Sequence, residues 1–396
     1  MPMKSSVSFF FIALLFLMTI WHSLHCFAAE ASTTQKNTPI IGKAAFSIEN
    51  HNEVYSAPNA DSKVAFLGDS WDDANDPSGI NDVILERLFT IIKGVHAQMV
   101  FFTGDLALGL ERVHAPKEKS TTKRFLYEYD INETNWAEQG LAYRSESYSK
   151  QLQAFADIQR RNLGSGIPFF PLSGEHESMG ADSLDIFRAY FGLTTIKPQN
   201  MQGLAYTVSI GRAFFVVLSA FEPFLKDKSS SELLKKNILM WMDEQLKTAG
   251  QSRYLFVVGH EPAFSTTETF GKFRGLDKDP HFRDAFWNIL VKNHVLAYFC
   301  SHENLYDRSY RNGVWQFISG GAGAPFRLQE FDRAFYHFLL LTVPGDKNKK
   351  PEVNVVDSQG ILRDTIKLTE SFELYQKRIA EKPESGRDGL TTFSGI

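Results

Sequence analysis

The sequence predicts an α/β protein, and two observations carry that prediction. Short, wholly apolar runs recur along the chain, as expected of strands that are buried on both faces of a sheet. Amphipathic stretches with helical spacing separate several of these runs, which is the alternation that places helices over a mainly parallel sheet. The chain has 396 residues, of which 43% are hydrophobic, so it is long and apolar enough for a sizeable core. Many of its 34 phenylalanines fall in the apolar runs, which indicates core packing and not an aromatic binding surface.

Five apolar runs are the predicted core strands, and each is followed by a side chain that can bind a metal. The runs are Val64–Leu67, Met99–Thr103, Ile167–Leu172, Tyr254–Val258 and Val295–Cys300. The residues after them, in the same order, are Gly68-Asp69, Gly104-Asp105, Gly174-Glu175-His176-Glu177, Gly259-His260 and Ser301-His302. Ligands gather at the carboxyl ends of strands in α/β sheets, so these side chains are expected to meet in one cleft.

The remaining elements follow from the same periodicities. Helices are expected over Asn81–Lys93, Tyr148–Asn162, Ser231–Leu246 and His281–Lys292. A hairpin is expected over Gln202–Ser219, and late strands over Phe335–Val343 and Glu352–Asp357. The polar stretch 111–148 is interpreted as an insertion loop over one face of the domain.

The first 29 residues are interpreted as a signal peptide. Lys4 precedes the apolar run Phe9–Trp21, and small residues follow at Ala28 and Ala29. The run is short for a membrane span, although an uncleaved N-terminal anchor is the alternative. The rest divides into a lead-in segment (30–62), one large domain (63–370) and a C-terminal tail (371–396).

Cysteine content and charge narrow the class further. Only Cys26 and Cys300 are present, so neither a disulfide framework nor a thiolate-rich metal site is expected. An exported protein without a disulfide indicates a bacterial periplasm or a secreted location. The formal net charge of -4 argues against nucleic acid as a partner. Oxygen and imidazole ligands without thiolates suit Fe, Mn or Zn.

Taken together, the five blocks resemble those of the calcineurin-like metallophosphoesterases, with the closest similarity to the purple acid phosphatase branch. Gly259-His260-Glu261-Pro262 and Ser301-His302-Glu303-Asn304, followed by Leu305–Arg308, carry the likeness to that branch. Ser319–Gly323 matches the glycine turn of the family. The resemblance covers roughly Val64–Pro325 and implies a four-layer α/β/β/α sandwich with two metals in a cleft.

The resemblance also implies a role for each site residue. Asp105 would bridge two metals, and Asp69 would bind the first of them. Glu175, His260 and His302 would bind the second metal. His176 would be the catalytic histidine, which donates to the phosphate or to the leaving group.

Several positions depart from the family pattern. Glu175 stands where the family has asparagine, and Asn304 stands where it has a second histidine. Leu108 occupies the position of the tyrosine ligand of the purple branch, Trp71 that of a histidine in other branches, and Ser301 that of a glycine.

Counting ligands predicts one firm metal site and one weak one. The first metal keeps Asp69 and Asp105, with only the weak amide of Asn304 in addition. Asp72 or Asp73 could assist it, although a solvated acidic loop is the alternative reading of those two residues. Tyr306 and Arg308 could equally line the cleft or pack in the core.

These observations predict an exported, metal-dependent phosphoesterase that hydrolyses a phosphomonoester with a metal-activated water. Its partner would be a small phosphorylated substrate, with no nucleic acid and no membrane association once the leader is cleaved. The alternative is a catalytically weak or inactive pseudophosphatase, which keeps the fold and binds a phosphorylated ligand or a protein. The sequence does not set the oligomeric state.

Overall fold

A computed structural model describes most of the domain. The described residues are 53–54, 59–72, 78–109, 139–178, 183–193, 205–219, 228–249, 253–265, 275–326 and 332–368. The expected signal peptide, the tail, Asp73 and most of the lead-in and insertion segments lie outside these ranges. Residues 1–42 and 43–396 form separate units, and the description concerns the second. No helix in the described part of the chain has the length and apolar character needed to cross a membrane.

Two mixed sheets form the centre of the domain. The seven-stranded sheet contains, in spatial order, β1 (Glu53–Val54), β5 (Ala205–Ile210), β6 (Ala213–Leu218), β7 (Tyr254–Val258), β8 (Ala297–Cys300), β10 (Val314–Ser319) and β9 (Tyr306–Arg311). The six-stranded sheet contains β13 (Leu362–Lys367), β12 (Glu352–Asp357), β11 (His337–Val343), β2 (Ser62–Leu67), β3 (Met99–Phe102) and β4 (Phe169–Pro171).

The five strands that precede the candidate ligands run in parallel within their sheets. In the six-stranded sheet β2 pairs with β3 and β3 with β4, all in parallel. In the seven-stranded sheet β7 pairs with β8 in parallel, with Val258 opposite Phe299. Because the carboxyl ends of parallel neighbours lie at one edge, this topology brings the strand ends of each sheet together.

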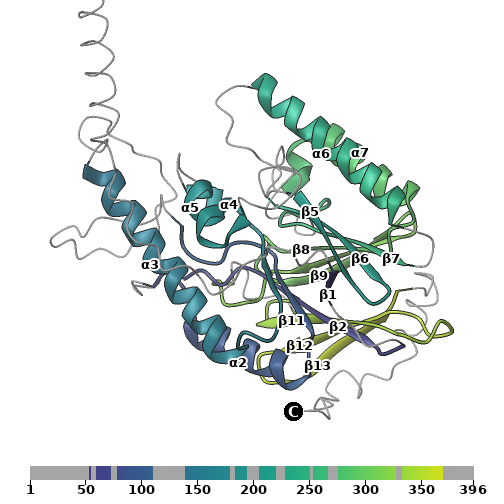
Figure 1. Ribbon diagram of the computed structural model, residues 1–396, viewed down its shortest axis with the longest axis horizontal. Coiled ribbons are helices and arrows are strands. Elements are labelled where there is room, and N and C mark those ends of the chain that lie inside the picture. Colours follow the sequence, from purple (N-terminus) through teal and green to yellow (C-terminus); the bar gives the residue numbers. More distant parts are fainter. Residues whose placement is uncertain are drawn as a thin grey trace, which may run out of the picture. The chain divides into compact units, whose positions relative to one another are not determined.

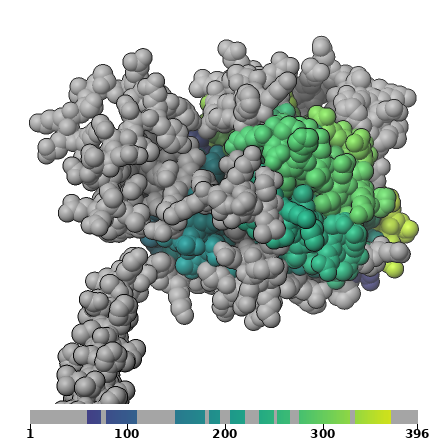
Figure 2. Space-filling model, turned by 90° about the horizontal axis from the view of Figure 1, so that it is seen from above, coloured from purple at the N-terminus to yellow at the C-terminus, as the bar shows by residue number. Residues whose placement is uncertain are grey.

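Helices cover the outer face of each sheet. On α2 (Asp82–Gly94) and α3 (Gln139–Asn162), Phe89 and Phe155 pack edge-on against Phe102 of β3, with ring centroids 6.5 and 4.9 Å away. On the opposite side, α6 (Lys228–Thr248) and α7 (Pro280–Lys292) share a buried cluster with β6, β7 and β8. Figure 1 shows the two helix pairs on opposite sides of the strands, and Figure 2 shows the face formed by the green segments around α6 and α7. The expected α/β/β/α order is confirmed.

Aromatic rings fill the space between the two sheets. Phe66 of β2 stacks on Phe299 of β8 with centroids 4.0 Å apart, and it also contacts Phe215 of β6 at 6.0 Å. Phe101 of β3 reaches Phe215 at 5.1 Å. These buried contacts join the sheets and confirm that the phenylalanines report core packing.

Local sequence explains where the helices begin. The side chain of Asn81 accepts a hydrogen bond from the N–H of Ile84, which caps the start of α2. Asp279 accepts from the N–H of Phe282 in the same way, and Pro280 opens α7. Both helices bury one apolar face, as their periodicity predicts.

Some elements differ from the expectation. Helix α3 begins at Gln139, inside the stretch interpreted as an insertion loop. The sequence did not predict this early start because residues 139–147 are mostly polar and lack apolar periodicity. The hairpin of β5 and β6 is confirmed, with Ile210 opposite Ala213. Strand β9 was not expected, because this strand at the sheet edge is mostly polar and contains no apolar run. The short helices α4 (Glu175–Ser178) and α5 (Ser183–Tyr190) were also missed.

Candidate metal centre

The strand ends of both sheets converge on one site. Asp69 follows β2, Asp105 follows β3, and Glu175 opens α4 just after β4. From the other sheet, His260 follows β7 and His302 follows β8. Backbone hydrogen bonds join these ends, including the N–H of Gly68 to the carbonyl of Ser319 at 3.0 Å and the N–H of Ser301 to the carbonyl of His260 at 2.8 Å.

Two glycines leave the room that the ligands need. Gly104 has a φ of +106°, a backbone conformation that L side chains rarely adopt. A Cβ on Gly174 would collide with Oδ1 of Asp105 and lie 2.6 Å from Cε1 of His260. In the strand-glycine-acid pattern, glycine is therefore needed both for the conformation of the turn and for the space that the ligand side chains occupy.

Four side chains form a cluster that can hold one metal ion. Asp105, Glu175, His260 and His302 each offer a ligand atom, and these atoms all lie within 4.8 Å of one another. Oε2 of Glu175 lies 2.6 Å from Nε2 of His260 and 2.8 Å from Nδ1 of His302. The structure thus assembles the four residues that the sequence assigns to the firm site. Cys300 takes no part, because its thiol is buried and donates to the carbonyl of Phe317.

Hydrogen bonds behind the cluster orient His260. Its Nδ1 lies 2.7 Å from the carbonyl oxygen of Thr103, so this nitrogen carries the hydrogen and Nε2 faces the cluster. The hydroxyl of Ser301 donates to the same carbonyl at 2.8 Å and lies 3.1 Å from Nδ1. Serine in place of the family glycine therefore adds a support for this imidazole.

The electrostatics of the cluster favour a cation. Burial raises the pKa of Asp69 and raises the pKa of Asp105 well above its usual range. Burial acts in the same direction on Glu175, but His302 and His260 outweigh it and hold the pKa of Glu175 well below normal. Burial disfavours the charged form of His260, yet Asp105 and Glu175 raise its pKa well above normal. A cation bound among these carboxylates would offset their desolvation.

The first metal position has fewer candidate ligands than the four-residue cluster. Asp69 stands outside the four-residue cluster, and its Oδ2 accepts from the backbone N–H of His302 at 2.9 Å. Its Oδ1 is buried and has no hydrogen-bond partner among the described residues, nor has Nε2 of His302. Asn304 uses its amide nitrogen to donate to the carbonyl of Pro325 at 3.1 Å. The ligand roles of Asp69 and Asn304 stay predictions.

His176 lies beside the cluster. Its side chain is 1% exposed, and its Nδ1 lies 2.9 Å from the carbonyl oxygen of Leu108. Its backbone N–H donates to Oδ1 of Asp105, while its Nε2 lies 3.7 Å from the other oxygen of that carboxylate. A carbonyl can only accept, so Nδ1 carries a hydrogen and Nε2 is the nitrogen turned towards Asp105.

Sequence reasoning assigned no role to Glu177, which supports the site from behind. Its buried carboxylate accepts from the backbone N–H groups of Asp105 (2.8 Å), Leu106 (2.9 Å) and Gly174 (2.8 Å). It thereby ties two ligand-bearing loops together. Burial raises the pKa of Glu177 to about 7, against the effect of these hydrogen bonds. The one feature of the sequence that could have identified Glu177 is its place in the Gly-Glu-His-Glu block.

Tyr306 and Arg308, which could line the cleft or pack in the core, both contact Asp364. The hydroxyl of Tyr306 donates to Asp364 at 2.8 Å, and Arg308 forms an ion pair with the same carboxylate at 2.6 Å. These contacts join β9 to β13, so both residues have a structural role there. In the glycine turn, a Cβ on Gly321 would collide with Nδ1 of His337, so the backbone of this turn packs directly against that buried imidazole.

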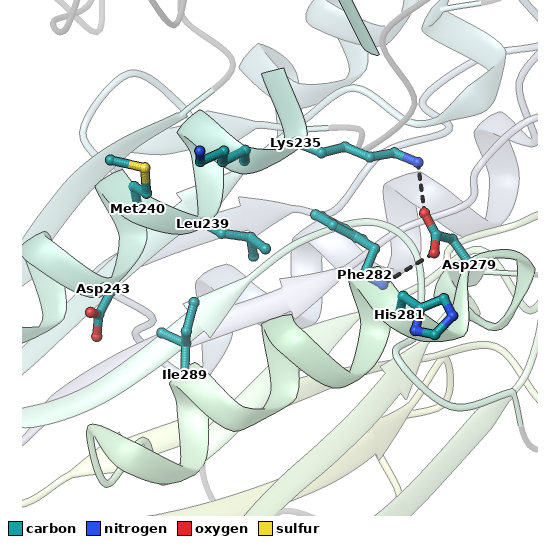
Figure 3. A pocket seen from close by; sticks show the side chains of 9 residues that line it. Lys235, Leu239, Met240, Asp243, Asp279, His281, Phe282 and Ile289 are labelled. Atoms are coloured by element: carbon teal, nitrogen blue, oxygen red, sulfur yellow. Dashed lines mark hydrogen bonds and ion pairs between the residues drawn. The ribbon is translucent and has the colours of Figure 1, made fainter. Parts of the chain in front are cut away.

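A separate groove of about 350 Å³ lies between α6 and α7, away from this cluster (Figure 3). Lys235 pairs with Asp279 across it at 3.0 Å, and Met240 beside it is 60% exposed. None of the residues of the metal cluster lines the groove.

Comparison with known proteins gives matches among solved structures alone, because no family model and no curated protein matches the chain. Purple acid phosphatase PPD1 of yellow lupin (Lupinus luteus) matches with a TM-score of 0.52 and 15% identity, over 79% of this chain and 55% of that chain. The chain thus spans about half the length of the lupin protein, given the 55% coverage.

Two further structures match less closely. GAP50, the anchor in the inner membrane complex of Plasmodium, has a TM-score of 0.48 and 14% identity, over 82% of this chain and 98% of that chain. Vps29 of Entamoeba histolytica, complexed with Zn²⁺, has a TM-score of 0.34 and 13% identity, over 78% and 99%. At these sequence identities the likeness concerns the fold alone. The assignment of the fold rests on the lupin structure, whose TM-score is 0.52.

Proposed function

We propose that this chain, whose fold is that of the calcineurin-like metallophosphoesterases, is a metal-dependent phosphoesterase. The observation that carries the proposal is the meeting of Asp105, Glu175, His260 and His302, with ligand atoms within 4.8 Å of one another. Two carboxylates and two imidazoles without a thiolate fit Fe, Mn or Zn. The buried Oδ1 of Asp69, which has no hydrogen-bond partner among the described residues, would be an oxygen ligand for a second, weaker ion.

When bound, an ion at this cluster would supply Lewis-acid stabilisation of the phosphate oxygens and activation of the attacking water. Around it, the chain's own residues hold and orient. Asp105, Glu175, His260 and His302 would fix the ion, with His260 held by Thr103. The Nδ1 hydrogen of His176 is committed to Leu108, so a second proton at Nε2 would serve the leaving oxygen.

The substrate and setting belong to the same proposal. The absence of a basic excess in the sequence supports a small phosphorylated molecule over nucleic acid. The leader-like pattern of residues 1–29 supports export to a bacterial periplasm or secretion, with no membrane association after cleavage.

A second candidate is a pseudophosphatase that binds a phosphorylated ligand or a protein partner without turnover. The observation that favours it is the thin first site. Leu108 has an apolar side chain at the position where the resemblance implies a tyrosine ligand, and Asn304 could offer only a weak, neutral amide oxygen. Loss of the first ion would weaken activation of the attacking water most.

Metal content and turnover, measured on the same preparations, test the proposal. The purified protein would be analysed for bound metal and assayed with an aryl phosphate in the presence of Mn, Fe or Zn. We expect bound metal and hydrolysis in the wild type, and loss of both in His260→Ala. His281→Ala, an exposed histidine on α7, is the matched control and should retain both. Metal without turnover would support the pseudophosphatase, and a wild type with neither metal nor turnover would refute the phosphoesterase.

A further inference from the structure

An indole ring covers one face of the imidazole of His176. The rings of Trp71 and His176 are stacked, with centroids 4.8 Å apart and planes inclined by 25°. Both side chains are buried, with 4% and 1% of their surface exposed.

The backbone around Trp71 is fixed by the same loop that fixes Leu108. Trp71 forms a β-bridge with Ile80, and the carbonyl of Gly79 accepts from the N–H groups of both Asp72 (3.1 Å) and Leu108 (3.0 Å). The indole and the carbonyl oxygen that binds Nδ1 of His176 therefore belong to one hydrogen-bonded frame.

Together these two contacts define the orientation of the imidazole. The hydrogen bond from Nδ1 to Leu108 fixes one edge of the ring, but by itself it permits rotation about that bond. The indole face removes this freedom because the ring must stay nearly parallel to it. Nε2 is then left with one direction, 3.7 Å from Oδ2 of Asp105 and towards the metal cluster.

We infer that Trp71 is a positioning residue, which holds His176 in the orientation that presents Nε2 to the leaving group of the substrate. For its kinetic consequence this inference rests on the proposed phosphoesterase function. The orientation itself can be measured in the protein without turnover. A misplacement of a catalytic group by about 1 Å can lower a rate about 100-fold, so loss of the indole should act mainly on kcat.

The test compares Trp71→Leu, which removes the aromatic face, with Trp71→Phe, which keeps a smaller one. Trp287→Phe is the matched control, since Trp287 is also buried and packs on an aromatic ring, Phe264, but on α7. Each protein would be labelled with ¹⁵N-histidine, with His176→Gln used to assign the His176 signals, and its metal content, kcat and KM would be measured.

In the wild type we expect a single His176 tautomer with the hydrogen on Nδ1. In Trp71→Leu the imidazole is free to turn out of its hydrogen bond to Leu108, so we expect averaged ¹⁵N shifts and a fall in kcat of about 10- to 100-fold, with KM and metal content unchanged. The spectrum of Trp71→Phe should lie between those of the wild type and Trp71→Leu, and that of Trp287→Phe should equal the wild-type spectrum. Unchanged His176 shifts in Trp71→Leu would overturn the inference, as would a loss of metal equal to the loss of rate. A wild type without turnover would refute the proposed function, and the ¹⁵N spectra would still decide the position of His176.

Discussion

Acidification should destabilise this fold through one buried histidine, His337 on β11. Its imidazole is fully buried, and Nδ1–H donates to the carbonyl oxygen of Phe335 at 2.7 Å. The rings of Tyr306 and Phe335 pack against it, with centroids 5.6 and 5.0 Å away. Burial lowers the pKa of His337 to about 4, although the Phe335 carbonyl and Asp357 act in the opposite direction.

The size of the effect follows from the two protonation equilibria. In the unfolded chain the imidazole has a pKa of about 6.5. The native value lies below it, so the unfolded state takes up the proton first as the pH falls. The contribution to stability is therefore fully present above pH 6.5 and is lost on the way down to about pH 4. It amounts to about 3 kcal/mol in total, of which about 2 kcal/mol should be lost by pH 5.

Urea unfolding of wild type and His337→Gln at pH 8, 7, 6 and 5 would measure this term. The other titrating groups are common to both proteins, so the difference between their free energies of unfolding isolates His337. That difference should change by about 2 kcal/mol between pH 8 and pH 5, in the direction that removes the advantage of the wild type. The exposed His281→Gln should follow the wild type at every pH. Parallel curves for wild type and His337→Gln would refute the reasoning.

Three further predictions concern the site and the core. Gly174→Ala should abolish metal binding while leaving the far-UV circular dichroism unchanged, because its Cβ would enter the cluster, whereas Gly166→Ala, with open space around its Cβ, should bind metal normally. Leu108→Tyr combined with Asn304→His should raise the metal content measured by elemental analysis, and no gain would count against the assignment of the first site. Phe66→Ala should lower the free energy of unfolding in urea by about 3–5 kcal/mol, because it opens a cavity between the two sheets.

The convergence of the ligands was predictable from sequence because two local signals coincide there. Continuous apolar runs identify strands buried on both faces, and in parallel strands the residues just after them share an edge. Asp105, Glu175, His260 and His302 all follow such runs, and the structure brings them together. Even Glu175, a departure from the family pattern, occupies the place that its position in the block predicts.

The supports of the site were not predictable, because they depend on contacts between loops without periodicity. Trp71 lies in the loop after β2, where it forms an isolated β-bridge, and nothing in its neighbours along the chain indicates a stack on His176. Glu177 is two residues from a candidate ligand, but its three hydrogen bonds reach the loops at Asp105 and Gly174. The sequence therefore predicts which side chains meet, while tertiary structure decides how they are held.

The backbone conformation of the site supports a metal-binding role over a site without function. Asp69, Asp105 and His302 all have positive φ angles, of 63°, 55° and 70°. Such conformations each cost roughly 1–3 kcal/mol and persist only where the surrounding structure requires them. Here they bring two buried carboxylates, both with raised pKa values, next to imidazoles, an arrangement that is itself unfavourable without a compensating cation. A bound ion would offset the desolvation of these carboxylates, so metal binding is the part of the phosphoesterase proposal that the site supports most directly. Whether a phosphate ester is also cleaved then depends on whether an ion binds at the first position. That in turn depends on whether further ligands join Oδ1 of Asp69, which has no hydrogen-bond partner among the described residues.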